Sequence, residues 1–321
     1  MYSKIKQLTS IFSIYNLSKQ INKTMLRRYF IGYILLFVAG CTTVTNNQPR
    51  NSNNSLLKDQ EKLRFAVSGI QSLANWQRDY APFRIALEEV LETKIEFVPI
   101  DSLMEATALQ LALVDIVLAG PSEYAIIKAR TNAMPIVAVT RPTYRAVIVV
   151  RKDSEIKSLA DLKDKTIELG KIGSTGSYLG QIKMLMDAGL NIQSDVNILN
   201  SKEYDFKALN NGEADAWGRT SHRYEKTMQK ESVDQNDYLL LAESPRLPND
   251  VFIASSKLEP MLVAEIRERM LKNKEKMLQA ILSIPPLPSK YEGGTLVAAE
   301  DSDYDMIREV YKAIGEENFI K

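Results

Sequence analysis

Short apolar runs alternate with amphipathic stretches along most of this chain, and this alternation restricts its fold more than any other feature. Residues 63–67, 94–99 and 115–118 have the length and pattern of strands, and segments with helical signals follow each of them. Residues 144–151 (YRAVIVVR) are almost continuously apolar, as a strand buried on both faces should be. The alternation predicts an α/β fold, and 321 residues suffice for two lobes with separate cores.

The second half of the chain keeps the same alternation. Strands are expected around residues 166–169 and 251–254, among others. A single long amphipathic helix is expected over residues 262–282, ended by the prolines that begin at Pro285.

The N-terminal segment has the pattern of an export signal. Two arginines at positions 27–28 precede an apolar run at residues 29–39, which is about half as long as the roughly 20 residues that span a bilayer. A basic segment before a short apolar one is typical of a signal peptide. The run ends in VAGC, which resembles the bacterial lipobox, whose cysteine receives lipid and becomes the mature N-terminus. Residues 1–40 are therefore predicted to be a lipoprotein signal peptide and Cys41 the lipidation site; the alternative is a buried free cysteine after a short core helix.

The residues on either side of this signal also have a pattern. Residues 1–24 add nothing to a signal peptide, so Met25 is the better start. Residues 42–55 (TTVTNNQPRNSNNS) are polar and lack apolar periodicity, which indicates a flexible tether over residues 41–59.

Charge and composition exclude several classes of function. Residues 1–40 hold six Lys and Arg and no acid, so the remaining chain has 35 basic against 40 acidic side chains. A mildly acidic protein lacks the basic surface of a nucleic-acid binder. One cysteine and one histidine exclude an internal disulfide, a multi-cysteine metal site and a histidine cluster. We therefore expect no metal and no cofactor.

A hydroxyl-rich loop at residues 173–178 (GSTGSY) precedes an expected helix at residues 178–188. A helix N-terminus presents unpaired N–H groups and the positive end of its dipole, which together attract anions. Ser174, Thr175 and Ser177 add three hydroxyls to that end. The alternative interpretation is an ordinary Ser/Thr cap on a packed helix. No Gly-Lys-Ser/Thr follows, so the loop is not a Walker A motif.

From about residue 63 onward, the chain resembles the phosphate, phosphite and phosphonate-binding proteins of ABC importers. Each motif alone is weak, but the set keeps the family's order over roughly 255 residues. The segments that carry the resemblance are VDI at 114–116 with GPSEY at 120–124, YRAVIVVRKDSEIKSLADLKDKT at 144–166, GSTGSY at 173–178, NGEADA at 211–216, SPRLPND at 244–250 and Tyr304-Asp305.

The resemblance implies a type II periplasmic binding protein, a two-lobed Venus-flytrap fold with a mixed sheet in each lobe and a cleft between them. By this resemblance, residues 60–143 and 250–321 form the first lobe and residues 144–249 the second. Crossings near Thr143 and Asp250 would then act as hinges.

The same resemblance assigns the hydroxyl loop to the oxyanion. The family has Ser-Thr-Ser-Gly where this chain has Ser174-Thr175-Gly176-Ser177, so Gly and Ser are exchanged. Ser174 and Thr175 keep the family's positions, whereas the exchange displaces Ser177 by one residue.

Five further residues fall at family ligand positions. Tyr144 stands where a tyrosine hydroxyl faces the ligand, unless it is a core aromatic. Ser102 stands where a second tyrosine is frequent, unless it only caps its helix. Lys202 replaces a histidine that contacts the oxyanion, unless it is an isolated surface lysine. His222 replaces a glutamate that grips the amine of aminophosphonates, unless it is a solvated helix residue. Asp250 matches an aspartate with the same amine-gripping role, so the pair predicts a weaker amine requirement than an aminoethylphosphonate specialist has.

The sequence therefore predicts an extracytoplasmic lipoprotein, anchored through Cys41, that presents phosphonate or a related phosphorus oxyanion to an ABC permease. A sensor domain for a signalling partner is the alternative from another class, and a neighbouring permease gene would decide between them. A sulfonate or another anion is the alternative ligand. No nucleophile–base pair stands out, so we do not expect an enzyme.

Overall fold

The computed structural model describes residues 55–67, 77–100, 104–201, 206–230, 234–285 and 287–321. The predicted signal peptide, Cys41, Ser102 and Lys202 lie outside these residues. The strands form two mixed sheets, which confirms the predicted α/β fold.

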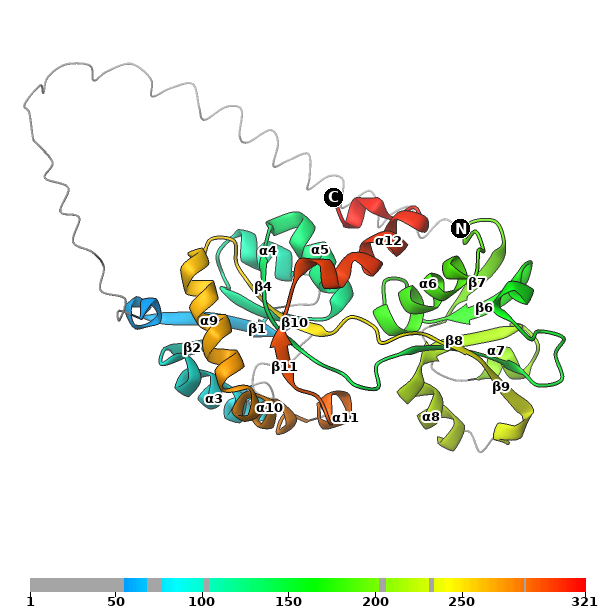
Figure 1. Cartoon of the computed structure of the whole chain (residues 1–321), viewed down its shortest axis with the longest axis horizontal. Helices are drawn as coiled ribbons and strands as arrows, with labels where there is room; N and C mark the ends of the chain where they lie inside the picture. Colours follow the sequence, from blue (N-terminus) through cyan, green and yellow to red (C-terminus); the bar gives the residue numbers. More distant parts are fainter. Residues whose placement is uncertain (1–54, 68–76, 101–103, 202–205, 231–233, 286) are drawn as a thin grey trace, which may run out of the picture. The chain divides into compact units, whose positions relative to one another are not determined.

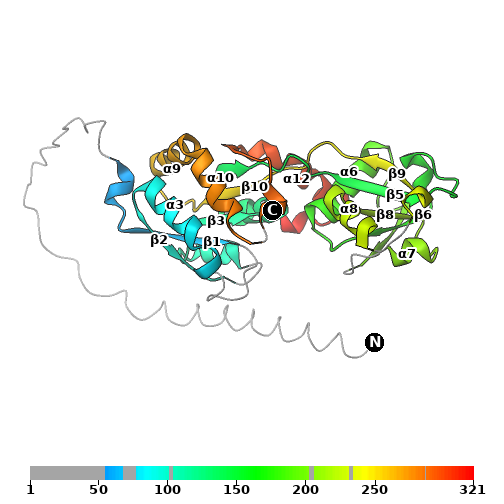
Figure 2. The same cartoon turned by 90° about the horizontal axis from the view of Figure 1, so that it is seen from below.

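The first sheet has six strands in the order β11-β4-β10-β3-β1-β2, with β10 and β11 antiparallel to β4. Its strands are β1 (Lys62–Val67), β2 (Lys94–Phe97), β3 (Ile116–Ala119), β4 (Met134–Val139), β10 (Asp250–Ala254) and β11 (Leu296–Ala298). Helices cover both faces of this sheet, as Figures 1 and 2 show. They are α3 (Ala81–Leu91), α9 (Pro260–Lys272) and α10 (Lys274–Leu282) on one face, and α4 (Glu105–Gln110) and α5 (Pro121–Thr131) on the other.

The second sheet has five strands in the order β7-β6-β8-β5-β9. Its strands are β5 (Ala146–Arg151), β6 (Lys165–Leu169), β7 (Val196–Asn200), β8 (Ala216–Thr220) and β9 (Tyr238–Glu243). The helices of this part are α6 (Gly180–Asp187), α7 (Lys207–Asn210) and α8 (Ser221–Lys230). Strand β5 is buried on both faces, because Val147 and Val149 join one apolar cluster while Ile148 and Val150 join the other.

Two segments join the sheets, and we call residues 140–145 and 244–249 the crossover segments. They are hydrogen-bonded to each other: the Leu247 N–H donates to the Tyr144 carbonyl at 2.9 Å, and the Arg141 N–H donates to Asn249 Oδ1 at 3.1 Å. Tyr144 therefore lies just before β5 and not inside it.

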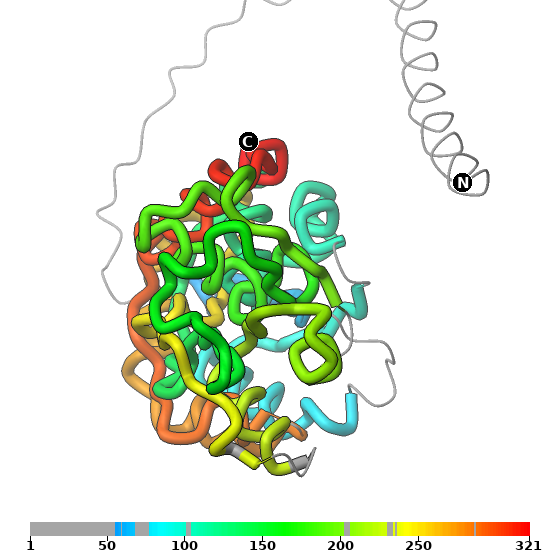
Figure 3. Tube along the Cα trace, turned by 90° about the vertical axis from the view of Figure 1, so that its right-hand side faces the viewer, coloured from blue at the N-terminus to red at the C-terminus, as the bar shows by residue number. Residues whose placement is uncertain are grey.

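The C-terminal helix α12 (Asp305–Ala313) packs differently from our expectation for residues 250–321. Tyr304, just before it, belongs to an apolar cluster of the first sheet, but Ile307 and Tyr311 belong to one of the second. Gln193 Nε2 also donates to the Ala313 carbonyl at 3.2 Å, and Figure 3 shows this C-terminal segment in red beside the green second sheet. The chain thus passes between the sheets a third time, and the lobe boundaries at 143/144 and 249/250 remain a proposal.

The helix expected over residues 262–282 is two helices, α9 and α10, separated at Asn273. Asn273 has φ −111° and ψ 29°, and its Nδ2 donates to the Arg269 carbonyl at 2.9 Å. An asparagine side chain that bonds the backbone in this way competes with helical hydrogen bonds. The prediction of one continuous helix was therefore wrong.

Candidate functional site

Two adjoining cavities, of about 490 and 510 Å³, bring the predicted site residues together. Both are lined by Arg141, Tyr144, Ser174 and Lys290, so they meet along these four side chains. The six predicted ligand residues that the structure describes all line one or both cavities. Tyr144 and Ser174 line both, Ser177 and His222 line the first, and Thr175 and Asp250 line the second.

The hydroxyl loop enters its helix through a wider turn than we expected. A five-residue π-helical turn, η3 (Thr175–Leu179), follows Ser174 and runs directly into α6. The N–H groups of Tyr178 and Leu179 both donate to the Ser174 carbonyl, at 3.0 and 2.9 Å. The N–H groups that begin a helix have no partner inside it, and the residues at this end of η3 line the cavities.

Thr175 has the most unusual environment in the loop. Its side chain is buried, and its Oγ1 has no hydrogen-bond partner within the part of the chain that the structure describes. A buried hydroxyl without a partner costs free energy, and a bound ligand is one way to provide the partner.

The packing around residue 176 explains why glycine stands at the exchanged position. A Cβ on Gly176 would lie 2.4 Å from Thr220 Cγ2 and 2.7 Å from Tyr144 Cε2, closer than such atoms approach. Only glycine lets the loop pack this tightly against Tyr144, so the serine stands one position later, at Ser177.

Tyr144 is buried beneath a cation. The Cζ of Arg141 lies 3.4 Å from the centre of its ring, a cation–π contact. Burial raises the pKa of Tyr144 to about 12, although Arg141 opposes this shift. The phenol therefore keeps its proton at neutral pH and is available as a hydrogen-bond donor to an anion.

Asp250 is buried, and other side chains of the protein contact both of its carboxylate oxygens. Its residue is 2% exposed, its Oδ2 lies 2.6 Å from Lys290 Nζ, and its Oδ1 lies 3.6 Å from Arg141 Nη1. The Tyr291 hydroxyl also donates to Oδ2. Burial alone would raise the pKa of Asp250, but Lys290 and Arg141 outweigh burial and hold that pKa below its ordinary value. Asp250 is thus an anion with two cationic partners.

Glu123, on α5, is a second carboxyl at the same cavity. Burial raises its pKa, and the nearby charge of Asp250 adds to the shift. Ser122 Oγ donates to Glu123 Oε2 at 3.2 Å.

Basic side chains outnumber acidic ones around the two cavities. The described lining residues include five basic side chains, Arg141, Lys171, Arg223, Lys226 and Lys290, and two acidic ones, Glu123 and Asp250. This balance favours an anionic ligand.

Sequence reasoning missed several of these residues. Arg141 lies in a crossover segment, where its place beside Tyr144 was a usable signal. Lys290 lies on the short helix α11 (Pro288–Tyr291), some forty positions from Asp250, and no local pattern marks it. Tyr311 and Phe319 line the second cavity because the C-terminal segment packs against the second sheet.

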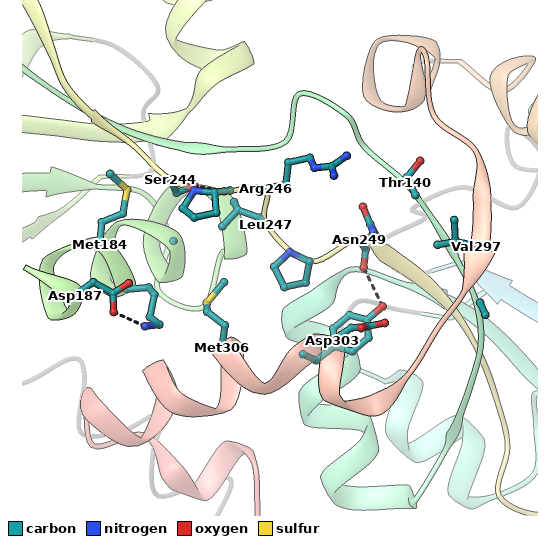
Figure 4. A pocket seen from close by; sticks show the side chains of 16 residues that line it. Thr140, Met184, Asp187, Ser244, Arg246, Leu247, Asn249, Val297, Asp303 and Met306 are labelled. Atoms are coloured by element: carbon teal, nitrogen blue, oxygen red, sulfur yellow. Dashed lines mark hydrogen bonds and ion pairs between the residues drawn. The ribbon is translucent and has the colours of Figure 1, made fainter.

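A further cavity, of about 600 Å³, has a different lining (Figure 4). It is lined by residues of α6, the second crossover segment and the segment around β11 and Met306, and by none of the predicted site residues. Met184, Leu247 and Met306 give it an apolar part, whereas Arg246 and Asp303 are charged. Its mixed lining lacks the grouped hydroxyls of the two site cavities.

Comparison with known families decides between the classes of function. Residues 65–304 match the model of the family described as ABC transporter, phosphonate, periplasmic substrate-binding protein. The chain belongs to this family. Its members are the extracytoplasmic substrate-binding components of transporters, which work with a membrane permease and a small ligand.

Solved structures show the same fold at low sequence identity. A Xanthomonas citri protein bound to ATP is 14% identical, with a TM-score of 0.60 over 81% of this chain and 98% of the other. PhnD1 from Prochlorococcus marinus in complex with methylphosphonate is 18% identical, with a TM-score of 0.54 over 80% and 99%. The aliphatic sulphonate binding protein SsuA from Escherichia coli is 16% identical, with a TM-score of 0.51 over 81% and 89%.

Membrane-spanning helices and metal clusters are both absent from the described residues. In these ranges no helix is long and apolar enough to cross a membrane. The same residues contain no group of three or more His, Cys, Asp or Glu side chains arranged to hold a metal ion.

Proposed function

We propose that this protein binds a phosphonate or a related phosphorus oxyanion between its two lobes and delivers it to an ABC permease. Ser174, Thr175, Ser177 and Tyr144 donate hydrogen bonds to the oxyanion. The observation that carries the proposal is the buried Thr175 hydroxyl, which has no partner among the described residues and lies on the wall of a cavity whose lining includes Arg141, Lys171 and Lys290. Donors held in place before the ligand arrives bind an anion with little reorganisation.

The remaining predicted residues have less support. His222 is exposed on α8 at the rim of the first cavity, where it can reach a ligand that extends toward solvent. Ser102 and Lys202 stay predictions from the family resemblance.

A ligand screen by thermal unfolding tests the proposal. The panel contains phosphate, phosphite, methylphosphonate, 2-aminoethylphosphonate, sulfate and taurine. A ligand at 100 times its dissociation constant stabilises a protein by about 2.7 kcal/mol. We expect the phosphorus compounds to raise the unfolding temperature; stabilisation by taurine alone would move the protein to the sulfonate class, which the fold also accommodates.

We also propose that the protein is a lipoprotein held at the membrane through Cys41. Support comes from the VAGC sequence after a short apolar run and from membership of a periplasmic protein family. Cys41→Ser should move the protein from the membrane fraction to the soluble fraction. A variant that still sediments with membranes would refute the lipid anchor.

A further inference from the structure

The carboxylate that the family resemblance assigns to a ligand amine is already paired in this protein. Asp250 Oδ2 contacts Lys290 Nζ at 2.6 Å and also accepts a hydrogen bond from Tyr291. Its other oxygen lies 3.6 Å from Arg141. A ligand ammonium would have to displace Lys290 or lie beside two cations. Like charges at such distances repel, so this arrangement disfavours an amine.

The two cations around Asp250 leave a surplus of positive charge at the cavities. Arg141 and Lys290 line both cavities, and their side chains are 18% and 37% exposed. Asp250 and Glu123 are the two acids among the described lining residues, against five bases. The Arg141 Nε is buried and has no hydrogen-bond partner within the described residues. Arg141 therefore keeps a hydrogen-bond donor that Asp250 does not use and that is available to an anion.

Two of the hydroxyl donors come from a different element than these cations. Ser174 and Thr175 belong to the loop before α6, whereas Arg141 lies on a crossover segment and Lys290 on α11. Both groups nevertheless line the same cavity of about 510 Å³. One ligand can thus meet hydroxyls with one end and cations with the other.

We infer that the ligand carries a second anionic group, and that Arg141 and Lys290 bind it while the hydroxyl loop holds the phosphorus oxyanion. This inference rests on the proposed function. The second group is a carboxylate or a similar anion on a short organic chain. An arginine fork and a lysine ammonium are the side chains that proteins use for such groups. Asp250 acts as a positioning residue, because it holds both cations at the cavity wall.

The test compares three ligands that differ mainly at the end away from phosphorus: phosphonoacetate, ethylphosphonate and 2-aminoethylphosphonate. Isothermal titration calorimetry gives the affinity of each. An added charge-assisted contact strengthens binding by about ten- to a hundredfold. We expect phosphonoacetate to bind at least about tenfold more tightly than ethylphosphonate, and 2-aminoethylphosphonate to bind no better than ethylphosphonate.

Variants then assign the preference to the cations. In Lys290→Gln the ratio of phosphonoacetate to ethylphosphonate affinity should fall toward one. Because this variant leaves Asp250 with less neutralising charge, Lys290→Gln with Asp250→Asn is the second variant, and the ratio should fall there too. Lys312→Gln is the matched control, because Lys312 is an exposed lysine outside both cavities, and its ratio should match the wild type.

The outcomes separate this inference from the proposed function. If ethylphosphonate binds and phosphonoacetate gains nothing, or if the amino ligand is preferred, the second-anion inference is refuted and the phosphonate function stands. If none of the three ligands binds, the second-anion inference is refuted, and the thermal screen with phosphate, phosphite and methylphosphonate decides whether the proposed function stands. Retention of the full preference in both Lys290 variants would also contradict the assigned role.

Discussion

Replacing Thr175 with valine should change stability and affinity in opposite directions. Valine has nearly the shape of threonine and carries a methyl group in place of the hydroxyl. The hydroxyl is buried and has no partner among the described residues, and such a group costs about 1–3 kcal/mol. We therefore expect the ligand-free variant to be as stable as the wild type or more stable, by about 1 kcal/mol. For a domain of this size, that corresponds to a rise of about 2 °C in unfolding temperature.

Binding should weaken in the same variant. A hydrogen bond to a charged group contributes about 1.5–3 kcal/mol, and each 1.4 kcal/mol is about a tenfold change in the dissociation constant. Methylphosphonate affinity, measured by calorimetry, should therefore fall roughly ten- to a hundredfold. Unfolding of the ligand-free protein in urea gives the stability change.

Thr93 provides a matched control. It is also buried, but its Oγ1 donates to the Leu57 carbonyl at 2.7 Å. Thr93→Val should lose about 0.5–1.5 kcal/mol of stability because it removes a buried hydrogen bond, while the Leu57 carbonyl keeps its bond from the Gln60 N–H, and it should bind ligand normally. If Thr175→Val behaved like this control, losing stability while keeping its affinity, the hydroxyl would be a structural cap and the ligand assignment would be wrong.

Three further predictions concern the surroundings of the site. Arg219→Met should lower the free energy of unfolding in urea by about 3–5 kcal/mol, because Arg219 pairs with Glu168 at 2.9 Å and both side chains are almost fully buried. Adding Glu168→Gln should restore part of that stability, and an unchanged urea midpoint in Arg219→Met would contradict the buried pair. Gly176→Ala should weaken methylphosphonate binding, since the methyl would displace Tyr144, and unchanged affinity would show that the loop has room. The stability that Asp250 contributes should be complete above its unfolded pKa of about 4 and be lost as the pH falls through its lower folded pKa. Asp250→Asn should therefore flatten the acid limb of stability against pH, and an equally steep limb would exclude Asp250 as its source.

Local patterns predicted the framework well. Residues 144–151 were expected to be buried on both faces, and β5 divides its three valines and one isoleucine between two apolar clusters. Ser158 and Asp161 have the spacing of a capping box, and both hydrogen bonds of that box are present at η2 (Leu159–Leu162). These features depend on neighbours within a few residues, which is the range over which a sequence pattern carries information.

The partners of Asp250 could not be predicted in this way. Lys290 and Tyr291 lie about forty positions along the chain and reach Asp250 only because β10 and α11 meet in the folded protein. The same limit applies to α12, whose amphipathic pattern does not say which sheet it covers. The break at Asn273 had a local signal, since asparagine bonds readily to its own backbone, but periodicity outweighed it.

The charged end of the site lies where the chain passes between the lobes. Arg141 belongs to one crossover segment, and Asp250 begins the strand that follows the other. When lobes of such a protein rotate, residues near the crossings move least, and residues on the body of either lobe move most. The hydroxyl loop lies on the body of the second sheet, between β6 and α6. A ligand held at its anionic tail by Arg141 and Lys290 would therefore stay in place while closure brings the hydroxyls onto its phosphorus end.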